Sequence, residues 1–504
     1  MKRCNTLAEC IEGKGQFVDD IANGLWAICE ESSWVIPAHL DKLQKAGKDL
    51  PDVAEPTVDL FGAETGSLLA WVTYLHGPKL DAVSPLIRKR VSRELSARIL
   101  TPNLTRDDFW WMKAAMNWNP WIVSNWLTVA LLTEENEPRR QATVAKVTRT
   151  LDNFLNPYPT DGGCDEGPGY WNHAAGALFD CLELLHSAAA GNVAVYDQPL
   201  IQNMARFIYH AHIADDQFIN FADAAPKQHV NGDRVYLFGK RIGDEPLAAF
   251  GAFAARSQQP GQGAVSGSLG HVLPALFNLR ALATATPTAA IPLLRDVWLP
   301  DIGVMTARSD ARSSAGLYLA AQAGHNAEAH NHNDVGNFIV YADGHPALID
   351  VGVEVYNTKT FGPQRYDIWT MQSGYHNCPT INGVMQSAGR EFSAGGVAYK
   401  ADDNAAAMTL DLAKAYSPEA GVKTWQRTLR LNRHRNIAIT DAFRLTKPTS
   451  DLTLTLMTPY DVEITQPGVL TLTGQSKPGQ DTGRGKPPTL RIRYDATKLK
   501  PVIE

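Results

Sequence analysis

The chain has 504 residues, of which 44% are hydrophobic and 20% charged, and a formal net charge of −6 at pH 7. That length is too great for a single hydrophobic core, so two or three domains are expected. No apolar run approaches the ~18 residues of a membrane span, and no long basic run argues for nucleic acid as a partner. An acidic protein can still bind an anionic glycan through a local basic cleft.

The first ten residues, MKRCNTLAEC, contain two basic residues but no apolar stretch, so they do not read as a signal peptide. We therefore expect either a cytosolic protein or one whose leader is absent from this sequence. The six cysteines are scattered and lack CxxC spacing. In a chain of this length they are expected to be free thiols rather than a disulfide framework.

Residues 1 to about 285 show the spacing of amphipathic helices. Apolar residues recur every three or four positions in Gln16–Cys29, Leu60–Leu75, Leu80–Leu100 and Ala175–Leu185, which predicts a helix for each segment. Turn signals such as HGPK, LTPN and NPYPTDGG separate these segments. Many medium-length helices joined by short loops predict stacked helical hairpins, arranged as a solenoid or a toroid.

The segment Ala283–Pro292 is small, polar and proline-containing, and we predict a linker there. After it, the apolar period changes from about 3.6 residues to 2. The alternation predicts strands that begin near Leu317, Phe338, Ile437, Leu452, Leu470 and Leu490. Such strands predict a large antiparallel β-sandwich, with a late loop at Gln475–Pro488.

The densest polar cluster, Ala327–Asn337, reads AEAHNHNDVGN and precedes a predicted strand. The later Asp343-Gly344 pair, between two apolar runs, is a hairpin signal. A turn centred there places Asp350 roughly opposite Asn337, with His332 in the entering loop at the same end of the hairpin. An imidazole and a carboxylate can therefore meet without strain.

A third ligand candidate, His376, follows in the polar, turn-rich stretch GYHNCPTING. His332, Asp350 and His376 would form a set of two histidines and one carboxylate, suited to zinc with one open position. Two other interpretations stay open. The H-x-H spacing would also let His330 and His332 bind one metal, and histidines of this kind also form hydrogen bonds at domain interfaces.

Tryptophan and asparagine cluster in Met116–Trp126, MNWNPWIVSNW. Exposed indole faces stack on sugar rings, and asparagine amides bond hydroxyl or carboxylate groups. Pro120 and the polar residues favour a helix end that faces a cleft. The alternative is that these tryptophans belong to the core of a helical bundle.

A glycine-rich loop, Asp161–His173, reads DGGCDEGPGYWNH and leads into a helix predicted to start near Tyr170. Tyr170 and His173 are three residues apart and would share one helix face. A tyrosine at a helix entry beside acidic and aromatic residues could donate or accept a proton. The alternative is a packing tyrosine with a solvated hydroxyl.

Two of these segments resemble a known family. AEAHNHNDVGNFIVYADGHPALIDVG at 327–352 and SGYHNCPTINGVMQ at 373–386 are similar to the heparinase II/III-like polysaccharide lyases, a family that includes heparinase II and oligoalginate lyases. NWNPW and DEGPGY fit the helical domain of the same family. The resemblance implies an α+β multidomain protein with an incomplete (α/α) toroid over 1–285 and an antiparallel β-sandwich over 293–504.

The resemblance also implies the roles of particular residues. It places zinc ligands on His332, Asp350 and His376, a catalytic histidine on His330 and a catalytic tyrosine on Tyr170.

The chain departs from the family in the helical segment that reads Asn117-Trp118-Asn119. Relatives commonly carry a histidine there, and this chain has none. The resemblance therefore leaves Asn117, with help from Asn119 or His330, to stabilise the substrate carboxylate, and it provides no histidine base from that segment.

The implied reaction is β-elimination at a uronic acid. A base removes the C5 proton, hydrogen-bond donors stabilise the enolate-like intermediate, and an acid protonates the leaving O4. Tyr170 is expected to be the acid; the base is Tyr170 in a syn elimination and His330 in the opposite stereochemistry. Zinc is expected to be structural.

Further substrate contacts are expected from seven residues in both halves of the chain, with a surface salt bridge as the alternative for each arginine. They are Asn119, Trp118, Trp121, Glu166, Arg365, Arg390 and Tyr375.

We therefore expect a lyase that acts on an anionic polysaccharide or oligosaccharide of the glycosaminoglycan or alginate type and leaves a 4,5-unsaturated uronate. The resemblance implies a periplasmic or secreted protein, and a homo-oligomer is left open. A glycoside hydrolase of the toroid type is one alternative, with paired carboxylates from Asp161, Asp165, Glu166 and Asp223. A non-catalytic glycan-binding protein is the other.

Overall fold

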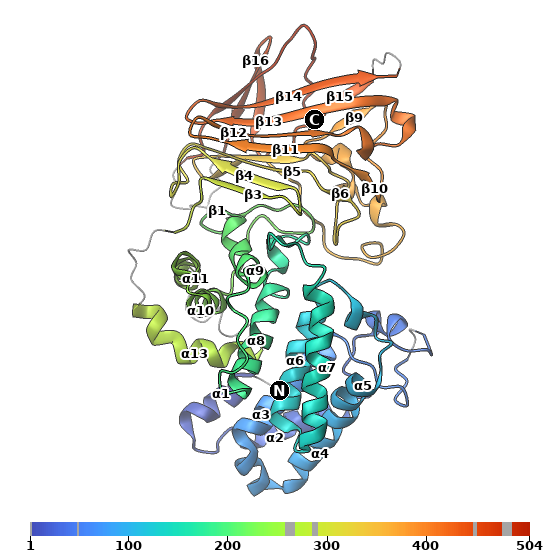
Figure 1. Ribbon diagram of the computed structural model, residues 1–504, viewed down its shortest axis with the longest axis vertical. Helices are drawn as coiled ribbons and strands as arrows, with labels where there is room; N and C mark the ends of the chain where they lie inside the picture. The colour runs from blue at the N-terminus through green and yellow to red at the C-terminus, as the bar shows by residue number, and fades with distance from the viewer. Residues whose placement is uncertain (1–2, 48–49, 258–267, 285–290, 447–450, 476–485) are drawn as a thin grey trace. The chain divides into compact units, whose positions relative to one another are not determined.

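The computed structural model describes residues 3–47, 50–257, 268–284, 291–446, 451–475 and 486–504 (Figure 1). Most of the predicted linker Ala283–Pro292 and of the predicted loop Gln475–Pro488 lies outside these ranges.

The chain forms two compact units that interleave in the sequence. The first, called the helical unit below, comprises 1–158, 172–205 and 230–289. The second, called the sheet unit, comprises 159–171, 206–229 and 290–504. The sheet unit thus takes two segments from the first half of the chain, in addition to everything after residue 290.

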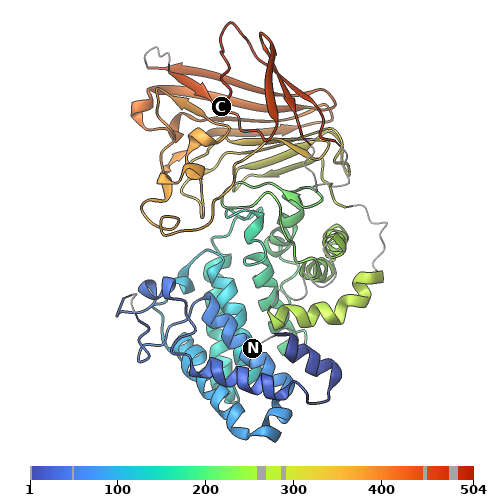
Figure 2. The ribbon, with the colours of Figure 1, turned by 180° about the vertical axis from the view of Figure 1, so that it is seen from behind.

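Helices make up most of the regular structure before residue 285. They are α1 Arg3–Glu12, α2 Val18–Glu30, α3 Leu60–Val83, α4 Pro85–Leu95, α5 Thr101–Thr105, α6 Trp118–Thr133, α7 Glu137–Leu155, α8 Ala175–Ala188, α9 Pro199–His210, α10 Gly232–Ile242, α11 Glu245–Ser257 and α13 Leu269–Thr284. The second helix, α2, packs against α3 and α4; both α1 and α2 lie in the blue, N-terminal part of the ribbon in Figure 2.

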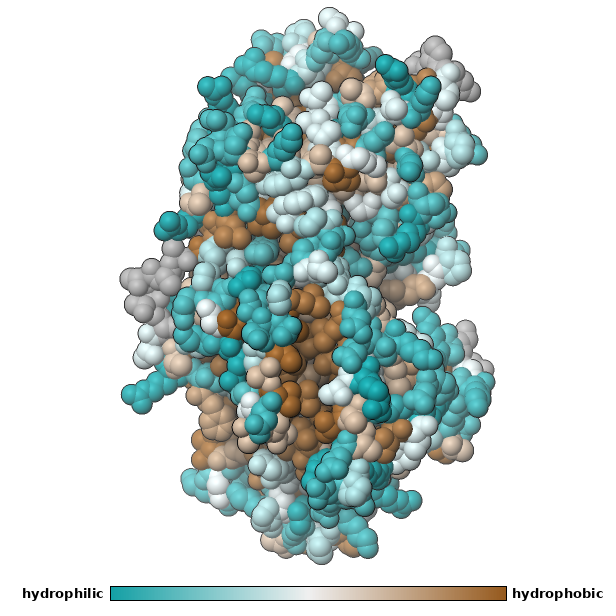
Figure 3. All heavy atoms as spheres, in the orientation of Figure 1, coloured by the Kyte–Doolittle hydropathy of each residue, from teal (hydrophilic) through white to brown (hydrophobic). Residues whose placement is uncertain are grey.

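The central helices α3 and α6 pack against each other. Asp59 caps α3, because its Oδ1 accepts from the backbone N–H of Gly62 at 2.7 Å and so satisfies an otherwise unpaired donor. Residues Ile122–Ala130 of α6 are all buried, as expected of a helix that is apolar on every side. Apolar side chains gather in a hollow on the face of this unit over α6 and α8 (Figure 3).

Two predicted turns of the helical unit are wrong. The HGPK sequence lies inside α3, with Pro78 in the helix interior, and the LTPN sequence continues from a π-helical turn into α5. Burial of neighbouring residues such as Leu80 and Leu100 outweighs the local preference of proline against helix. Among the described residues, no helix is long and apolar enough to cross a membrane.

The sheet unit contains antiparallel strands only, among the residues described. A five-stranded sheet joins β3 Asp296–Leu299, β4 Val304–Arg308, β5 Leu317–Gln322, β7 Phe338–Ala342 and β8 His345–Leu348. A four-stranded sheet joins β11 Gly395–Ala401, β12 Ala405–Asp411, β13 Val422–Asn432 and β14 Asn436–Leu445. A three-stranded sheet joins β16 Asp461–Gln466, β17 Val469–Thr473 and β18 Leu490–Arg493.

Three short strand pairs complete the sheet unit. They are β1 His212–Ala214 with β2 Gln217–Phe218, β6 His325–Asn326 with β10 Gly389–Ser393, and β9 Pro379–Ile381 with β15 Leu452–Leu454. The predicted strands near Leu317, Phe338, Ile437, Leu452, Leu470 and Leu490 are all confirmed, as is the change from helices to antiparallel sheets.

The hairpin between β7 and β8 forms as the sequence predicts. Asp343 and Gly344 have φ values of +50° and +75°, which is the backbone of a two-residue type I′ turn. Ala342 pairs with His345 across this turn. Beyond the strand ends, the Nδ2 of Asn337 donates to Oδ2 of Asp350 at 2.6 Å, so the hairpin brings a carboxylate to the end of the cluster at 327–337.

One apolar core serves the five-stranded and four-stranded sheets. Met305, Leu319 and Phe338 from the first sheet share it with Leu410 and Trp425 from the second. Each of these side chains is at most 1% exposed. The sheet unit is therefore held together by burial of the two inner sheet faces against each other.

We expect Leu410→Ala to destabilise the sheet unit by about 2–5 kcal/mol, because the substitution removes buried methyl groups and leaves a cavity. The matched control is Leu454→Ala on β15, where the native side chain is 38% exposed. Urea unfolding followed by near-ultraviolet circular dichroism measures both variants. Equal destabilisation by the two substitutions would contradict this account of the core.

Candidate functional site

The loop that carries Tyr170 packs directly against the segment that carries Asp223. Gly167 makes this possible: its φ is +87°, and a Cβ built on it would lie 2.8 Å from Cβ of Ala224 and 3.0 Å from O of Phe221. Any larger residue at this position would separate the two segments. Both belong to the sheet unit, which also carries His330 and His332.

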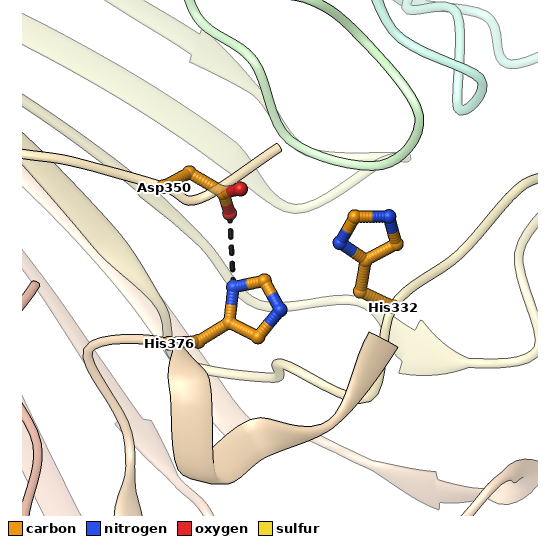
Figure 4. Close-up of side chains that lie close together, drawn as sticks. All are labelled: His332, Asp350 and His376. Atoms are coloured by element: carbon orange, nitrogen blue, oxygen red, sulfur yellow. Dashed lines mark hydrogen bonds and ion pairs between the residues drawn. The ribbon is translucent and has the colours of Figure 1, made fainter. Parts of the chain in front are cut away.

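The three predicted metal ligands converge in the interior of the sheet unit. One ligand atom from each of His332, Asp350 and His376 can be chosen so that all lie within 4.8 Å of one another. All three residues are at most 3% exposed. Figure 4 shows the carboxylate of Asp350 and the imidazole of His332 turned toward His376. Nδ1 of His376 lies 3.1 Å from Oδ2 of Asp350.

Each of the two imidazoles directs one nitrogen to a partner outside the ligand set and the other nitrogen toward the set. Nε2 of His376 lies 2.9 Å from the backbone O of Thr370, an acceptor only, so this nitrogen carries the proton. Nε2 of His332 lies 3.0 Å from Oδ1 of Asp223, while its Nδ1 is buried without a hydrogen-bond partner among the described residues. Protein zinc sites commonly bind their histidines in this way, with the second nitrogen held by a carboxylate or carbonyl.

Electrostatics at the same place favour a bound cation. Burial alone would lower the pKa of His376, but the carboxylates of Asp350 and Asp334 raise it to about 9. Burial raises the pKa of Asp334 to about 6. The carboxylates that stabilise a cationic imidazole here would also stabilise a metal ion, which would displace the proton on binding. The residues present therefore fit a metal ion.

Asp223 connects the metal-ligand set to the catalytic candidates. Its Oδ1 lies 3.0 Å from Nε2 of His332 and accepts from Nη2 of Arg365 at 2.9 Å. Its Oδ2 lies 2.8 Å from Nδ1 of His330 and accepts from the hydroxyl of Tyr356 at 3.0 Å. Burial acts to raise the pKa of Asp223, but these partners hold it well below its ordinary range, so the carboxylate is ionised.

An ionised Asp223 fixes the direction of the neighbouring hydrogen bonds. A carboxylate only accepts, so Tyr356 donates its single proton to Asp223. The hydroxyl of Tyr356 must then accept from the hydroxyl of Tyr170, which lies 2.7 Å away. Burial, with the charge of Asp223, raises the pKa of Tyr170 to about 12. Tyr170 is therefore a protonated phenol at neutral pH.

His330 lies beside this tyrosine in a constrained backbone conformation. Its φ is +56°, a left-handed value that residues other than glycine rarely adopt and that is common at functional sites. Nδ1 of His330 is 3.4 Å from the hydroxyl of Tyr170, and the two ring centroids are 4.5 Å apart. The other nitrogen, Nε2, lies 3.3 Å from Oε2 of Glu166.

The structure brings together Tyr170, His330 and Glu166, three residues that the sequence analysis named separately. Glu166 is only 2% exposed, so it contacts His330 rather than offering a free carboxylate to a glycan. The predicted helix beginning near Tyr170 is wrong. Tyr170 ends a 3-10 turn, Pro168–Tyr170, and His173 falls in the helical unit instead.

Two arginines predicted to bind substrate differ in their surroundings. Arg365 is buried, and its guanidinium donates to Asp223 and to the backbone oxygens of Asn331 and Thr360. It therefore neutralises a buried carboxylate, and its contacts do not support the predicted role in binding substrate. Arg390 is exposed on β10. Tyr375 is 41% exposed and directly precedes the metal-ligand candidate His376.

The remaining predicted residues belong to the helical unit. Asn117 is the N-cap residue of α6 and is 3% exposed. Asn119 is fully buried, and its Nδ2 donates to the backbone oxygens of Met112 and Thr150; this burial does not support the predicted contact with substrate. Trp118 is half-buried beside His39, with ring centroids 4.7 Å apart.

Trp121 is also half-buried and stacks on His173 with a centroid distance of 3.8 Å. Its indole N–H donates to Glu64 at 2.9 Å. The role of Asn117 in catalysis and those of Trp118 and Trp121 in glycan binding stay predictions.

Two functional residues were missed by the sequence analysis. Asp223 was considered only as a carboxylate of a hydrolase, although a single acid after the apolar run FINFA is a signal of a buried, paired charge. Tyr356 lies in an irregular segment between the two metal-ligand candidates Asp350 and His376. No local pattern distinguishes it from a surface tyrosine.

Comparison with known proteins identifies the part of the chain that holds most of this site. Residues 292–480 match the family described as heparinase II/III-like, C-terminal. This part of the sheet unit is similar to the C-terminal domain of that family. That match confirms the resemblance seen in the sequence over 327–386. No curated protein matches the chain.

Solved structures show that the fold extends over nearly the whole chain. A heparinase III structure has a TM-score of 0.64 at 12% identity, covering 93% of this chain and 66% of its own. The heparan sulfate lyase HepC from Pedobacter heparinus has a TM-score of 0.60 at 14% identity, covering 94% of this chain and 65% of its own. The chain thus spans slightly less than two thirds of the length of these proteins, with which it shares a fold.

The metal-ligand set makes a direct prediction. We expect the purified protein to contain one divalent metal ion per chain, and His376→Ala to lose it because a buried ligand is removed. Elemental analysis measures the metal, and thermal melting with and without a chelator measures its contribution to stability. The chelator should lower the melting temperature of the native protein but not that of the variant.

A matched control is His345→Ala, which removes a buried histidine of β8 that is absent from the ligand set. Unchanged metal content in His376→Ala would remove this residue from the set.

Proposed function

We propose that the protein is a polysaccharide lyase that cleaves a uronic-acid-containing glycan by β-elimination. The observation that supports this most is the contact between a protonated phenol and an imidazole, Tyr170 and His330, with 3.4 Å between their polar atoms. β-Elimination needs an acid and a base close to one sugar ring. The heparinase II/III-like domain supports the same class of reaction.

Tyr170 is suited to the role of acid. Its pKa of about 12 keeps the proton on the phenol, and the hydrogen bond to Tyr356 directs that proton away from His330. Transfer of this proton to the leaving O4 would complete the cleavage of the C4–O bond. The same pKa disfavours Tyr170 as the base, because that role requires a phenolate.

His330 is the more suitable base. Its Nδ1 proton is directed to Asp223, so Nε2 is the nitrogen that accepts the C5 proton. The carboxylates of Asp223 and Glu166, at 2.8 and 3.3 Å from the two ring nitrogens, stabilise the resulting imidazolium. We therefore favour elimination with separate acid and base.

We propose that the metal is zinc and that its role is structural. Zinc binds neutral imidazole and carboxylate oxygen in four-coordinate sites, and it would hold the loops of His332 and His376 in place. The elimination itself requires no activated water. By the same resemblance, we propose that the helical unit is an incomplete (α/α) toroid, the sheet unit a β-sandwich, and the protein periplasmic or secreted.

The two alternative functions receive less support from the geometry. A hydrolase needs two carboxyl groups that flank the scissile bond, whereas Glu166 and Asp223 are both buried and both contact His330. A non-catalytic glycan-binding protein would have no use for a histidine at φ +56° in contact with a phenol. We propose that the glycan is of the glycosaminoglycan or alginate type, and activity assays on candidate glycans identify which one is cleaved.

We expect the protein to release products that absorb in the ultraviolet from at least one member of a panel of heparan, chondroitin, alginate and glucuronan substrates. Tyr170→Phe should lower kcat at least ~100-fold, because general acid catalysis contributes factors of that order. The control is Tyr399→Phe on β11, a half-buried tyrosine whose hydroxyl has no partner among the described residues. Near-normal turnover in Tyr170→Phe would exclude this tyrosine as the acid.

Tyr356→Phe should lower kcat by about 10-fold to 100-fold, which corresponds to the loss of one hydrogen bond to a charged group. The KM should change little, because the hydroxyl of Tyr356 is directed to Tyr170 and Asp223 rather than to substrate. Steady-state kinetics on the substrate found above measures both constants. A rise in KM at constant kcat would contradict the positioning role.

A further inference from the structure

The segment from Arg365 to His376 is fixed against the loop of the catalytic histidine. Nε of Arg365 donates to the backbone O of Asn331 at 3.1 Å. The backbone N–H of Asn333 donates to O of Met371 at 3.0 Å. These bonds hold two successive turns of the segment beside His330, so side chains at its surface have a defined position relative to the catalytic residues.

Two large aromatic side chains of this segment are at the surface. Trp369 and Tyr375 are each 41% exposed. Their ring centroids are 5.2 Å apart, and the ring planes meet at 78°. The residues next to them, Thr370 and His376, are fully buried or nearly so, so the backbone that presents the rings is anchored in the core.

A carboxylate adjoins this aromatic corner. The indole N–H of Trp369 donates to Oε1 of Glu354, and this glutamate is exposed. Trp369 is the only one of the described residues with which the carboxylate forms a hydrogen bond, which leaves its second oxygen available to a ligand. Glu354 is two residues before Tyr356, whose hydroxyl contacts Tyr170.

The chemistry of these groups points to a sugar. The flat face of an indole or phenol packs on the apolar C–H face of a pyranose ring, and such amphipathic rings are enriched at binding surfaces. A carboxylate beside the rings accepts hydrogen bonds from hydroxyl or ammonium groups. It repels sulfate and carboxylate groups, which carry the same charge.

We propose that Trp369, Tyr375 and Glu354 form a subsite for a pyranose unit of the glycan that presents hydroxyl or free amino groups and no sulfate group. The subsite rests on the proposed lyase function, because it would bind a sugar that neighbours the uronate undergoing elimination. It makes this corner a determinant of specificity: the aromatic rings bind the sugar, and the carboxylate rejects sulfated units.

The experiment uses the full-length protein and the glycan found active above, in sulfated and unsulfated forms. Trp369→Ala and Tyr375→Ala should each raise KM about 2-fold to 10-fold, as expected for loss of an aromatic contact, with kcat within about 2-fold of the native value. Trp369→Phe, which keeps a ring, should recover most of the affinity. Glu354→Gln should raise the kcat/KM ratio of sulfated to unsulfated substrate.

The matched control is Trp26→Ala in α2. Trp26 belongs to the helical unit, is 39% exposed, and donates its indole N–H to Glu30 at 2.8 Å. It therefore matches Trp369 both in exposure and in its hydrogen bond to a glutamate. This variant should have native kinetics. Unchanged melting temperature and metal content show that each variant of the subsite is folded.

Unchanged KM in both alanine variants, or unchanged discrimination in Glu354→Gln, would overturn the subsite while leaving the lyase function intact. If the native protein cleaves no glycan, the lyase function fails separately. The subsite is then tested by calorimetric titration with unsulfated uronate oligosaccharides. Weaker binding by Trp369→Ala than by Trp26→Ala supports it, and equal or absent binding overturns it.

Discussion

The ionised, buried carboxylate of Asp223 is the group on which the arrangement of the site depends. Burial of an unpaired charge costs several kcal/mol, and here the charge is shared among His330, His332, Arg365 and Tyr356. His330 and His332 belong to one loop, whereas Tyr356 and Arg365 come from a later segment of the chain. Loss of any one would leave part of a buried charge unsatisfied, so the carboxylate fixes all four side chains together.

This carboxylate also connects the metal-ligand set with the catalytic pair. Oδ1 lies beside Nε2 of His332, which leaves Nδ1 of that ring facing the metal-ligand set. Oδ2 lies beside Nδ1 of His330, whose other nitrogen, Nε2, lies 3.3 Å from Oε2 of Glu166. One side chain therefore sets the tautomers of two histidines with different roles. A shift of the His332 ring would be transmitted to His330 through a single carboxylate.

The interleaving of the two units has a direct consequence for the chemistry. The segments 159–171 and 206–229, which carry Tyr170 and Asp223, lie in the same compact unit as His330 and the metal ligands. The phenols of Tyr170 and Tyr356 and the imidazole of His330 are therefore positioned by one compact unit. Their distances depend on close contacts such as that of Gly167 with Ala224 rather than on the relation between the two units.

Much of the fold and part of the site could be predicted from the sequence. The period-2 strands, the Asp343-Gly344 turn and the meeting of Asp350 with Asn337 are local features, because hairpin geometry follows from a few consecutive residues. The metal-ligand set followed from the same hairpin and from a resemblance concentrated at 327–386. The HGPK turn was wrong because burial along α3 outweighs the local preference of proline.

Only the tertiary structure decided which residues surround Tyr170 and His330. Asp223 and Tyr356 are separated by 133 positions, and Asp223 and His330 by 107, so no spacing in the sequence records their contacts. Arg365 and Asn119 are likewise buried, and they donate hydrogen bonds to Asp223 and to the backbone of Met112 rather than facing a glycan. The sequence determined the chemical groups and the local turns, whereas long-range packing determined which of those groups meet, because contacts of this kind depend on how distant segments share one core.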